Sequence, residues 1–455
     1  MKRIISIVFS LLISLTAFSV PAWGEYSSYL ETPLYSDCAM LICLDNNEVI
    51  FSKNINKQTK PASLTKVITA SIILAECTDL EETFTIPAEC IRELDGTGSS
   101  TCDLKEGETL TIHDLLRCLL IPSANDAATA LAYWSTGSDR QAFIDKMNAL
   151  AEELGCTNSH FMNVHGLDDD EHYVSCADMA VFFENAMSYP AFAEIVALTD
   201  YMLPETNMHK ERKITNTNFT LMPGYKDYYC KYELGGKTGT TSGAGSCLVS
   251  KASNNGYNYI AVCMNAPKED LDGDYVDENG AFVDTQQMYD WAFDNLRLVP
   301  IASSAKVVGE VPVKYGKGVD SVTLCPSGNS YGLMPKGVDE SSLLIEVVPD
   351  TAPQALKAPV KKGDVICKGR VLYAEDVIAE IDLVSSADIK RSFISFFGTT
   401  IEEIFSSVMF KALAVVIAIL LALLVGARFA AKKKKRKKSN YEELNAGDFI
   451  RKNRR

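Results

Sequence analysis

The sequence contains no Cys-x-x-Cys pair and no group of cysteines and histidines at the spacing of a zinc site, although it has 13 cysteines. We therefore expect no metal and no other cofactor. It also has no internal repeat and no low-complexity linker, which excludes a repeat array. Apolar residues make up 47% of the 455 residues and charged residues 23%, which is typical of a globular protein with two or three domains.

Basic charge is scarce over most of the chain. The formal net charge is −15, yet residues 432–455 alone carry eleven Lys and Arg against three Asp and Glu. The remainder is therefore strongly acidic, which argues against nucleic acid as a partner.

The residues around the cysteines indicate which of them are buried. An exported chain with an odd number of cysteines normally pairs most of them and leaves one over. Several here lie in apolar stretches, where cysteine behaves as a small buried hydrophobe: Cys38, Cys77, Cys118 and Cys263. We therefore expect mostly free, buried thiols.

Two apolar segments indicate where the chain resides. Residues 1–24 have a basic start, an apolar run and small residues at the end, which is the pattern of a cleaved signal peptide; the alternative is an N-terminal membrane helix. Residues 408–431 predict a transmembrane helix, followed at once by seven consecutive basic residues. Because positive charge stays on the cytoplasmic side, we expect a single-pass membrane protein with a cytoplasmic tail at 432–455 and an extracytoplasmic body.

The body divides into two parts by its patterns. Apolar runs at 39–44 and 49–52 predict a β-hairpin, helical spacing recurs between residues 63 and 187, and strands are expected at 246–250 and 257–264 before a last helix at 285–296. This order predicts an α/β (α+β) fold with an antiparallel sheet. Short β segments follow, and an amphipathic stretch precedes the membrane helix. The expected boundaries are 25–298 for the first domain, 299–388 for a small all-β domain and 389–407 for the amphipathic segment.

The sequence Ser63-Leu64-Thr65-Lys66 places a serine and a lysine on one face of a predicted buried helix. A serine hydroxyl needs a base before it becomes a nucleophile, and burial lowers the pKa of a lysine so that its neutral amine can serve as that base. The motif is weak by itself, because Ser303-Ser304-Ala305-Lys306 also matches it where we expect a strand.

Two further motifs follow in the chain. Ser123-Ala124-Asn125 comes after a helix-ending Pro122, so its two polar side chains are expected on a loop between helices. Lys237-Thr238-Gly239-Thr240 precedes a predicted strand and offers a cation and two hydroxyls, which suit a carboxylate. Each alone also fits a plain turn, but the set and its order are specific to penicillin-binding proteins and β-lactamases.

On these motifs the chain resembles the low-molecular-mass serine penicillin-binding proteins, specifically the D-alanyl-D-alanine carboxypeptidases. Further text shared with that family stands around the motifs and between them: Pro61-Ala62, Asn163-Val164-His165-Gly166-Leu167, Thr215-Asn216-Thr217-Asn218 and Ala244-Gly245. The resemblance covers about residues 36–296 and, more loosely, the β-rich part. It implies a transpeptidase fold of the penicillin-binding-protein and β-lactamase type.

The resemblance also implies roles. Ser63 is the acylated nucleophile, Lys66 its base, Ser123 a proton relay to the departing D-alanine, and Asn125 a holder of the substrate amide. The backbone N–H groups of Ser63 and Thr240 form the oxyanion hole. The terminal carboxylate of a peptidoglycan stem peptide binds to the third motif: Lys237, Thr238, Gly239 and Thr240. A β-lactam is expected to acylate the same serine.

Several alternatives stay open at this point. A D,D-endopeptidase uses the same residues, and a β-lactamase needs an added deacylating base, for which Glu152 and Glu153 are the nearest candidates. A non-catalytic β-lactam or wall sensor is a third possibility. His165 and His172 are expected to be structural. One departure from the family pattern is Gly236, which stands where a larger residue is common.

Overall fold

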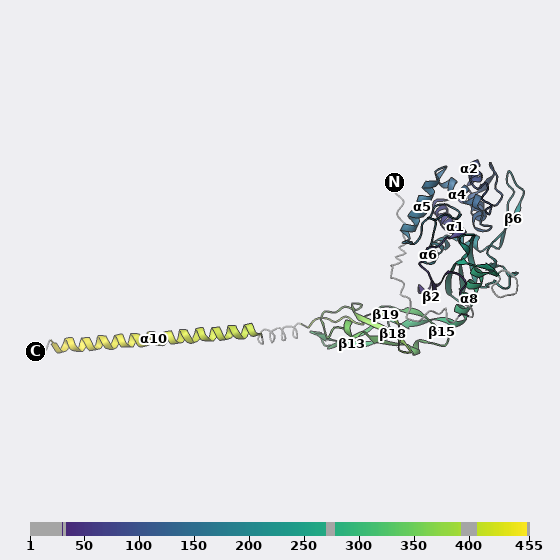
Figure 1. Ribbon diagram of the computed structural model, residues 1–455. Helices are drawn as coiled ribbons and strands as arrows, with labels where there is room; N and C mark the ends of the chain where they lie inside the picture. Colours follow the sequence, from purple (N-terminus) through teal and green to yellow (C-terminus); the bar gives the residue numbers. More distant parts are fainter. Residues whose placement is uncertain (1–29, 31–32, 270–277, 393–406, 453–455) are drawn as a thin grey trace. The chain divides into compact units, whose positions relative to one another are not determined.

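The computed structural model describes residue 30 and residues 33–269, 278–392 and 407–452. The signal peptide predicted at residues 1–24 and most of the amphipathic segment predicted at 389–407 lie outside this part of the chain. By their contacts the described residues form two compact units (Figure 1). The first unit runs to Ala302 and includes Asn329–Leu344 and Val371–Ala379; the rest forms the second. The domain boundaries at 298 and 388 stay predictions.

The first unit is built on a five-stranded antiparallel sheet in the order β2-β1-β9-β8-β7. The predicted hairpin at 39–52 is confirmed, as are the two strands predicted between residues 246 and 264. The first strand, β1, thus pairs in the middle of the sheet with β9, which follows all the helices of the larger layer in the chain. The strands are β1 Cys38–Cys43, β2 Glu48–Lys53, β7 Glu233–Thr241, β8 Gly245–Asn254 and β9 Tyr257–Ala266.

Alternating side chains of this sheet enter two different cores. On one face, Met40, Val249 and Val262 join the core formed with most of the helices. On the other face, Leu41, Leu248 and Ala261 pack with α8 (Gly280–Asn295). Helices therefore cover both faces, and α8 lies apart from the larger helical layer (Figure 1). The predicted α/β arrangement with an antiparallel sheet is confirmed.

The larger helical layer contains the predicted helices with small shifts at their ends. Its central helix begins at Thr65, two residues later than expected, because Ser63 lies in a 3-10 turn. The last helix of the unit begins five residues earlier than predicted, at Gly280, where the Asn279 side chain accepts a hydrogen bond from the Ala281 N–H. The helices are α1 Thr65–Glu76, α2 Ala88–Arg92, α3 Ile112–Leu120, α4 Asn125–Thr136, α5 Arg140–Glu153, α6 Cys176–Met187 and α7 Pro190–Val196.

Short strand pairs and 3-10 turns complete the first unit. The chain leaves the unit through β12, which pairs with β15. The pairs are β3 Thr83–Thr85 with β4 Thr109–Thr111, β5 Asp200–Leu203 with β6 Arg212–Thr215, β10 Lys268–Glu269 with β11 Glu278–Asn279, and β12 Leu296–Ala302 with β15 Ser330–Pro335. The turns are η2 Ala62–Leu64 and η3 Phe219–Leu221.

Most of a six-stranded sheet in the order β16-β18-β19-β14-β13-β17 lies in the second unit; the ends of β16, β18 and β19 are counted with the first. Two small cores support it, one around Leu324 and Leu383 and one around Val313 and Val360. Its second Ser-x-x-Lys sequence, at 303–306, forms a turn and no strand, which corrects the prediction; Lys306 N–H donates to the Ser303 carbonyl. The elements are β13 Gly309–Lys314, β14 Ser321–Pro326, β16 Leu344–Val347, β17 Leu356–Lys357, β18 Val365–Tyr373, β19 Asp376–Ser385 and η5 Pro349–Thr351. The turn η4 Glu340–Ser342 belongs to the first unit.

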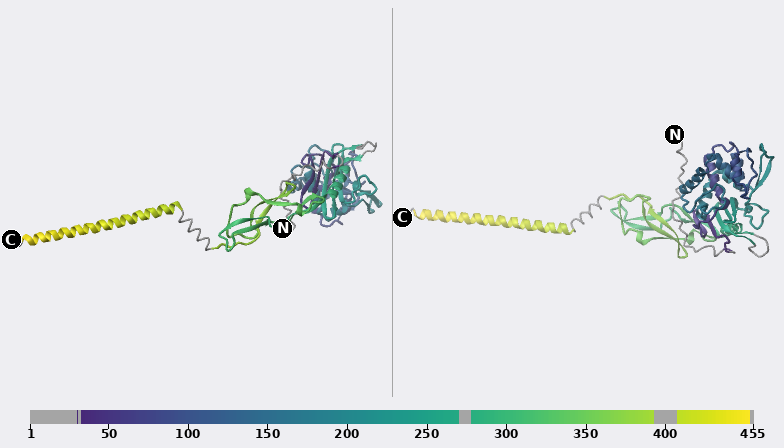
Figure 2. Two further views of the ribbon diagram at one scale, coloured as in Figure 1. Left: turned by 90° about the horizontal axis from the view of Figure 1, so that it is seen from below. Right: turned by 45° about the horizontal axis from the view of Figure 1, so that its top comes forward.

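A single helix, α10 (Val408–Lys452), ends the described chain (Figure 2). Its stretch Val408–Arg436 is long and apolar enough to cross a membrane, and none of that stretch is buried against protein. The helix predicted at 408–431 is therefore present, and it continues into the basic tail.

Candidate active site

The structure brings Ser63 and Lys66 into direct contact, 2.8 Å apart from Oγ to Nζ. Ser63 lies in η2, and Lys66 lies in the first turn of α1. Ala62 has a positive φ of 49°, a conformation that residues with a Cβ rarely adopt. The nucleophile candidate is therefore held by a strained turn, as is common at functional sites.

A hydrogen-bond chain that the sequence did not reveal holds this turn. The Thr65 hydroxyl donates to the Ala62 carbonyl over 2.8 Å and also contacts His172 Nε2 over 2.8 Å. His172 Nδ1 accepts a hydrogen bond from the Met162 N–H, so its proton lies on Nε2 and points at Thr65. Burial lowers the pKa of His172 to about 4, which keeps the ring neutral. This geometry agrees with the structural role expected for this histidine.

Lys66 is fully buried and has three oxygen neighbours. Besides Ser63, its Nζ lies 2.6 Å from Asn125 Oδ1 and 2.9 Å from the His165 carbonyl. Burial, and then the charge of Lys237, lower the pKa of Lys66 well below its usual value. His165 contributes its carbonyl to the site; burial lowers the pKa of its ring to about 3, so the ring stays neutral.

The loop carrying Ser123 and Asn125 is held by hydrogen bonds to the segment around Cys102. Ser123 has a positive φ of 64°, and Asn125 begins α4, where its N–H donates to the Ser100 carbonyl over 2.8 Å. The next residue, Asp126, is buried, and its carboxylate accepts hydrogen bonds from the N–H groups of Cys102 and Leu104. The segment around Cys102 is therefore attached to the loop that carries the second motif.

Lys237 joins the second and third motifs. Its Nζ donates to Ser123 Oγ over 2.9 Å and to the Thr238 carbonyl over 2.8 Å, and its side chain is almost fully buried. Burial lowers the pKa of Lys237 to about 7. The site thus contains two buried lysines, each hydrogen-bonded to a serine.

Strand β7 passes very close to the turn that carries Ser63. A Cβ built on Gly239 would stand 3.0 Å from the Ser63 nitrogen and 2.9 Å from the Pro61 carbonyl oxygen, so only glycine fits this approach. The next residue, Thr240, is exposed and lines a hollow of about 450 Å³ together with Ser246 and Asn265. The two backbone N–H groups expected to form the oxyanion hole therefore belong to segments that touch.

The segment Thr215–Asn218, to which the sequence assigned no role, contacts β7 through its side chains. Thr217 Oγ1 lies 2.5 Å from Thr238 Oγ1, and the Thr217 N–H donates to the Ile121 carbonyl. The Asn218 amide nitrogen donates to Glu233 Oε1 over 2.5 Å. Burial raises the pKa of Glu233 to about 7.

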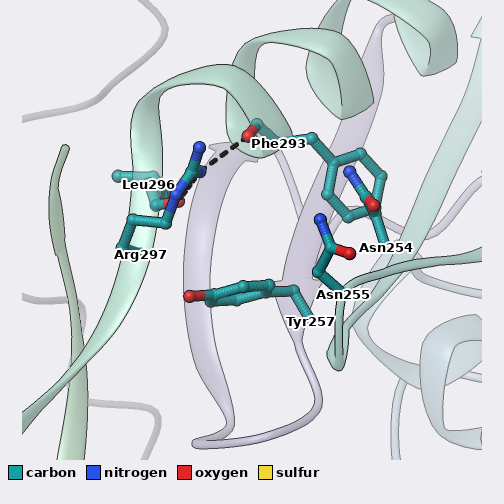
Figure 3. A pocket seen from close by; sticks show the side chains of 6 residues that line it. All are labelled: Asn254, Asn255, Tyr257, Phe293, Leu296 and Arg297. Atoms are coloured by element: carbon teal, nitrogen blue, oxygen red, sulfur yellow. Dashed lines mark hydrogen bonds between the residues drawn. The ribbon is translucent and has the colours of Figure 1, made fainter.

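A pocket elsewhere in the first unit lies at the β8–β9 turn and holds none of the predicted site residues (Figure 3). It has a volume of about 270 Å³ and is lined by Asn254, Tyr257 and Arg297, among others. Asn254 lies eight residues along β8 from Ser246, roughly 26 Å at strand spacing. Arg297 donates to the Phe293 carbonyl over 2.7 Å at the end of α8, which is a structural use of its charge.

No group of three or more metal-ligating side chains occurs among the described residues. All 13 cysteines are free and twelve of them are buried, which agrees with the sequence prediction.

Comparison with known proteins agrees with this geometry. Residues 28–268 match the family described as D-alanyl-D-alanine carboxypeptidase. The chain belongs to this family. Residues 297–391 match the C-terminal domain of penicillin-binding protein 5. The α/β transpeptidase fold with a small all-β domain, implied by the resemblance, is confirmed.

Curated members of the carboxypeptidase family match much of the chain. D-alanyl-D-alanine carboxypeptidase DacF of Bacillus subtilis is 29% identical over 89% of this chain and 99% of its own length. DacB2 of Mycobacterium tuberculosis is 31% identical over 55% of this chain and 79% of its own. Among solved structures, penicillin-binding protein 5 from Haemophilus influenzae is 26% identical with a TM-score of 0.62, over 79% of this chain and 99% of that one.

Proposed function

We propose that this member of the D-alanyl-D-alanine carboxypeptidase family removes the terminal D-alanine from peptidoglycan stem peptides through an acyl-enzyme on Ser63. The contact between Lys66 Nζ and Ser63 Oγ carries the proposal, because it joins a half-buried nucleophile to a fully buried base. Removing that alanine consumes the donor of cross-linking and so limits it.

The surroundings of Lys66 suit a neutral amine. A neutral amine has two N–H bonds and one lone pair. The N–H bonds are directed to the two neighbours that can only accept, Asn125 Oδ1 and the His165 carbonyl. The lone pair is then left for the Ser63 hydroxyl, which donates to it. Lys66 takes that proton as Ser63 Oγ attacks the carbonyl carbon between the two D-alanines.

The other motifs supply charge and protons. The N–H groups of Ser63 and Thr240 bind the developing oxyanion. When the C–N bond breaks, the departing D-alanine nitrogen receives a proton through Ser123, which Lys237 holds in place. Lys237, Thr238 and Thr240 bind the terminal carboxylate across Gly239, and Asn125 holds the substrate amide. Water then hydrolyses the ester. A β-lactam has an amide in the same place and acylates the same serine.

The β-lactamase alternative is less well supported. Glu152 and Glu153, the candidate deacylating residues, are both exposed at the end of α5. The endopeptidase alternative uses the same residues and differs only in substrate.

We further propose that α10 anchors the protein as a single span, with the catalytic unit outside and the basic tail in the cytoplasm. The apolar stretch and the seven basic residues that follow it support this orientation.

The test uses the full chain in detergent or nanodiscs with a peptide ending in D-Ala-D-Ala. We expect release of free D-alanine and a covalent penicillin adduct that mass spectrometry maps to Ser63. Ser63→Ala abolishes both signals. Ser303→Ala, in the second Ser-x-x-Lys sequence, is the matched control and retains both. An active Ser63→Ala variant refutes the assignment of the nucleophile, and a cross-linked dimer as the preferred substrate favours the endopeptidase.

A further inference from the structure

One end of the β-rich second unit carries a dense group of exposed lysines. This end is formed where β13 finishes, where β17 pairs with it, and where residues 389–391 return to it through the bridges Val360↔Ile389 and Gly316↔Arg391. We call this end of the unit the basic end. Its exposed lysines are Lys314, Lys317, Lys357, Lys361, Lys362 and Lys390.

Backbone pairing places these lysines around one small core. Lys314 is the partner of Lys357 in the parallel β13–β17 pair, and the Lys317 N–H donates to the Lys390 carbonyl. The underlying core contains Val313, Val360 and Ile389. The lysines therefore share one end of the sheet although they come from three separate stretches of the sequence.

These side chains differ from other cations of the same unit. Lys368 and Arg370 form ion pairs with Asp382 and Glu380 along β18 and β19. Within the described part of the chain, the six lysines of the basic end form no ion pair with a carboxylate. Arg391 adds a seventh cation, and its Nε donates to the Ala358 carbonyl.

Three aspartates lie among them and leave an excess of positive charge. Asp364 and Asp388 accept hydrogen bonds from the backbone N–H groups of Lys361 and Lys362, and Asp320 stands in the β13–β14 turn. Seven cations against three anions is unusual in a chain whose formal net charge is −15. An exposed group of like charges costs self-repulsion, which a negatively charged partner relieves.

The course of the chain identifies that partner. It leaves the second unit from the basic end, since Arg391 is bridged to Gly316, and the apolar helix begins at Val408 (Figure 1). Seventeen residues of chain span at most about 60 Å, so the basic end is tethered within reach of any bilayer that α10 crosses. Anionic lipid headgroups attract basic groups near the surface.

We propose that the basic end is a docking surface for anionic phospholipid headgroups on the outer side of the membrane. This inference rests on the proposed membrane anchoring. Docking holds the second unit in one orientation on the bilayer surface. Without docking, the unit would rotate freely about the chain that links it to α10. Anionic wall polymers carry the same charge. The chain tethers the basic end to the bilayer, however, and not to these polymers, which favours the lipid headgroups.

Hydrogen exchange of the full chain in nanodiscs tests the proposal. We expect amides in residues 314–320 and 357–364 to exchange about tenfold more slowly in discs containing phosphatidylglycerol than in phosphatidylcholine discs, and the difference to vanish at 0.5 M salt. A variant with four lysines changed to glutamine loses this protection. The changed residues are Lys314, Lys357, Lys361 and Lys362.

The control changes the same charge elsewhere: Lys226, Lys231, Lys306 and Lys336 to glutamine. It keeps the protection. Equal exchange in both lipids, or protection that survives in the first variant, overturns the proposal. Protection that appears only when an anionic wall polymer is added to phosphatidylcholine discs also overturns it and identifies the polymer instead. Release of D-alanine from a soluble peptide stays unchanged in both variants, which separates this test from that of the proposed activity.

Discussion

The side chain of Asn218 occupies the space that a side chain at Gly236 would need. A Cβ built on Gly236 would stand 2.9 Å from Asn218 Nδ2, and 2.8 Å from both Ser250 Cβ and the Val249 carbonyl oxygen. This explains the departure from the family pattern that the sequence shows directly before Lys237. Glycine is required here because its neighbours leave no room for a Cβ. The amide of Asn218 fills the space that a larger side chain would occupy.

We expect Gly236→Ala to destabilise the protein by roughly 1–3 kcal/mol, because the added methyl group overpacks a buried strand. The measurement is the thermal unfolding midpoint of the full chain in detergent. Gly224→Ala is the control, since a Cβ there meets nothing within 4 Å. Equal midpoints for the two variants would contradict the explanation.

The pKa of Lys237, about 7, predicts a pH dependence of substrate capture. Below pH 7 this lysine is cationic and binds the terminal carboxylate, and above pH 7 the free enzyme loses that charge. We therefore expect kcat/KM for a peptide ending in D-Ala-D-Ala to fall as the pH rises through about 7. The profile is measured by release of D-alanine.

Lys237→Arg provides the control for that profile, because arginine stays protonated throughout this range. Its absolute activity is expected to be lower, but the fall above pH 7 should disappear. A fall that persists in this variant assigns the titration to another group.

Thr217 is expected to position Thr238 for the substrate carboxylate. Thr217→Val keeps the volume and removes the 2.5 Å contact between the two hydroxyls. A hydrogen bond of about 1–1.5 kcal/mol corresponds to up to roughly tenfold in KM. The readout is the preference for a peptide with a free terminal carboxylate over the same peptide ending in an amide.

That preference should drop in Thr217→Val and return in Thr217→Ser, which restores a hydroxyl. A general structural defect would lower the activity on both peptides equally and leave the preference unchanged. That outcome would remove Thr217 from carboxylate recognition.

His172 is expected to control acylation through the turn that carries Ser63. His172→Phe removes the contact that orients the Thr65 hydroxyl, which in turn donates to the Ala62 carbonyl. Small misplacements of a reacting group cost up to about 100-fold in rate, so we expect acylation by penicillin to slow by about 10- to 100-fold. Stopped-flow measurements separate this rate from the initial binding of penicillin.

The conservative variant His172→Gln retains an amide that can donate to Thr65, and it should recover most of the rate. If His172→Phe acylates at the normal rate and only melts at a lower temperature, the histidine serves stability alone.

Local patterns in the sequence determined much of this molecule. The α/β order of elements, the apolar helix near the C-terminus and the three motifs could be predicted, because each depends on residues close together in the chain. The contact of Ser63 with Lys66 is of this kind, since the two residues are three positions apart, about one helical turn. The same local reasoning predicted that α1 begins at Ser63. The helix begins at Thr65, because Ser63 lies in the 3-10 turn Ala62–Leu64 that precedes it.

Only the tertiary structure decided the contacts between segments. Lys237 reaches Ser123 across 114 residues, and Thr217 reaches Thr238 across 21. The lowered pKa of each lysine depends on burial by distant parts of the chain. The lysines of the basic end gather in the same way, from three stretches that only the β sheet brings together. Spacing along the chain carries no information about such neighbours, because packing of the whole domain selects them.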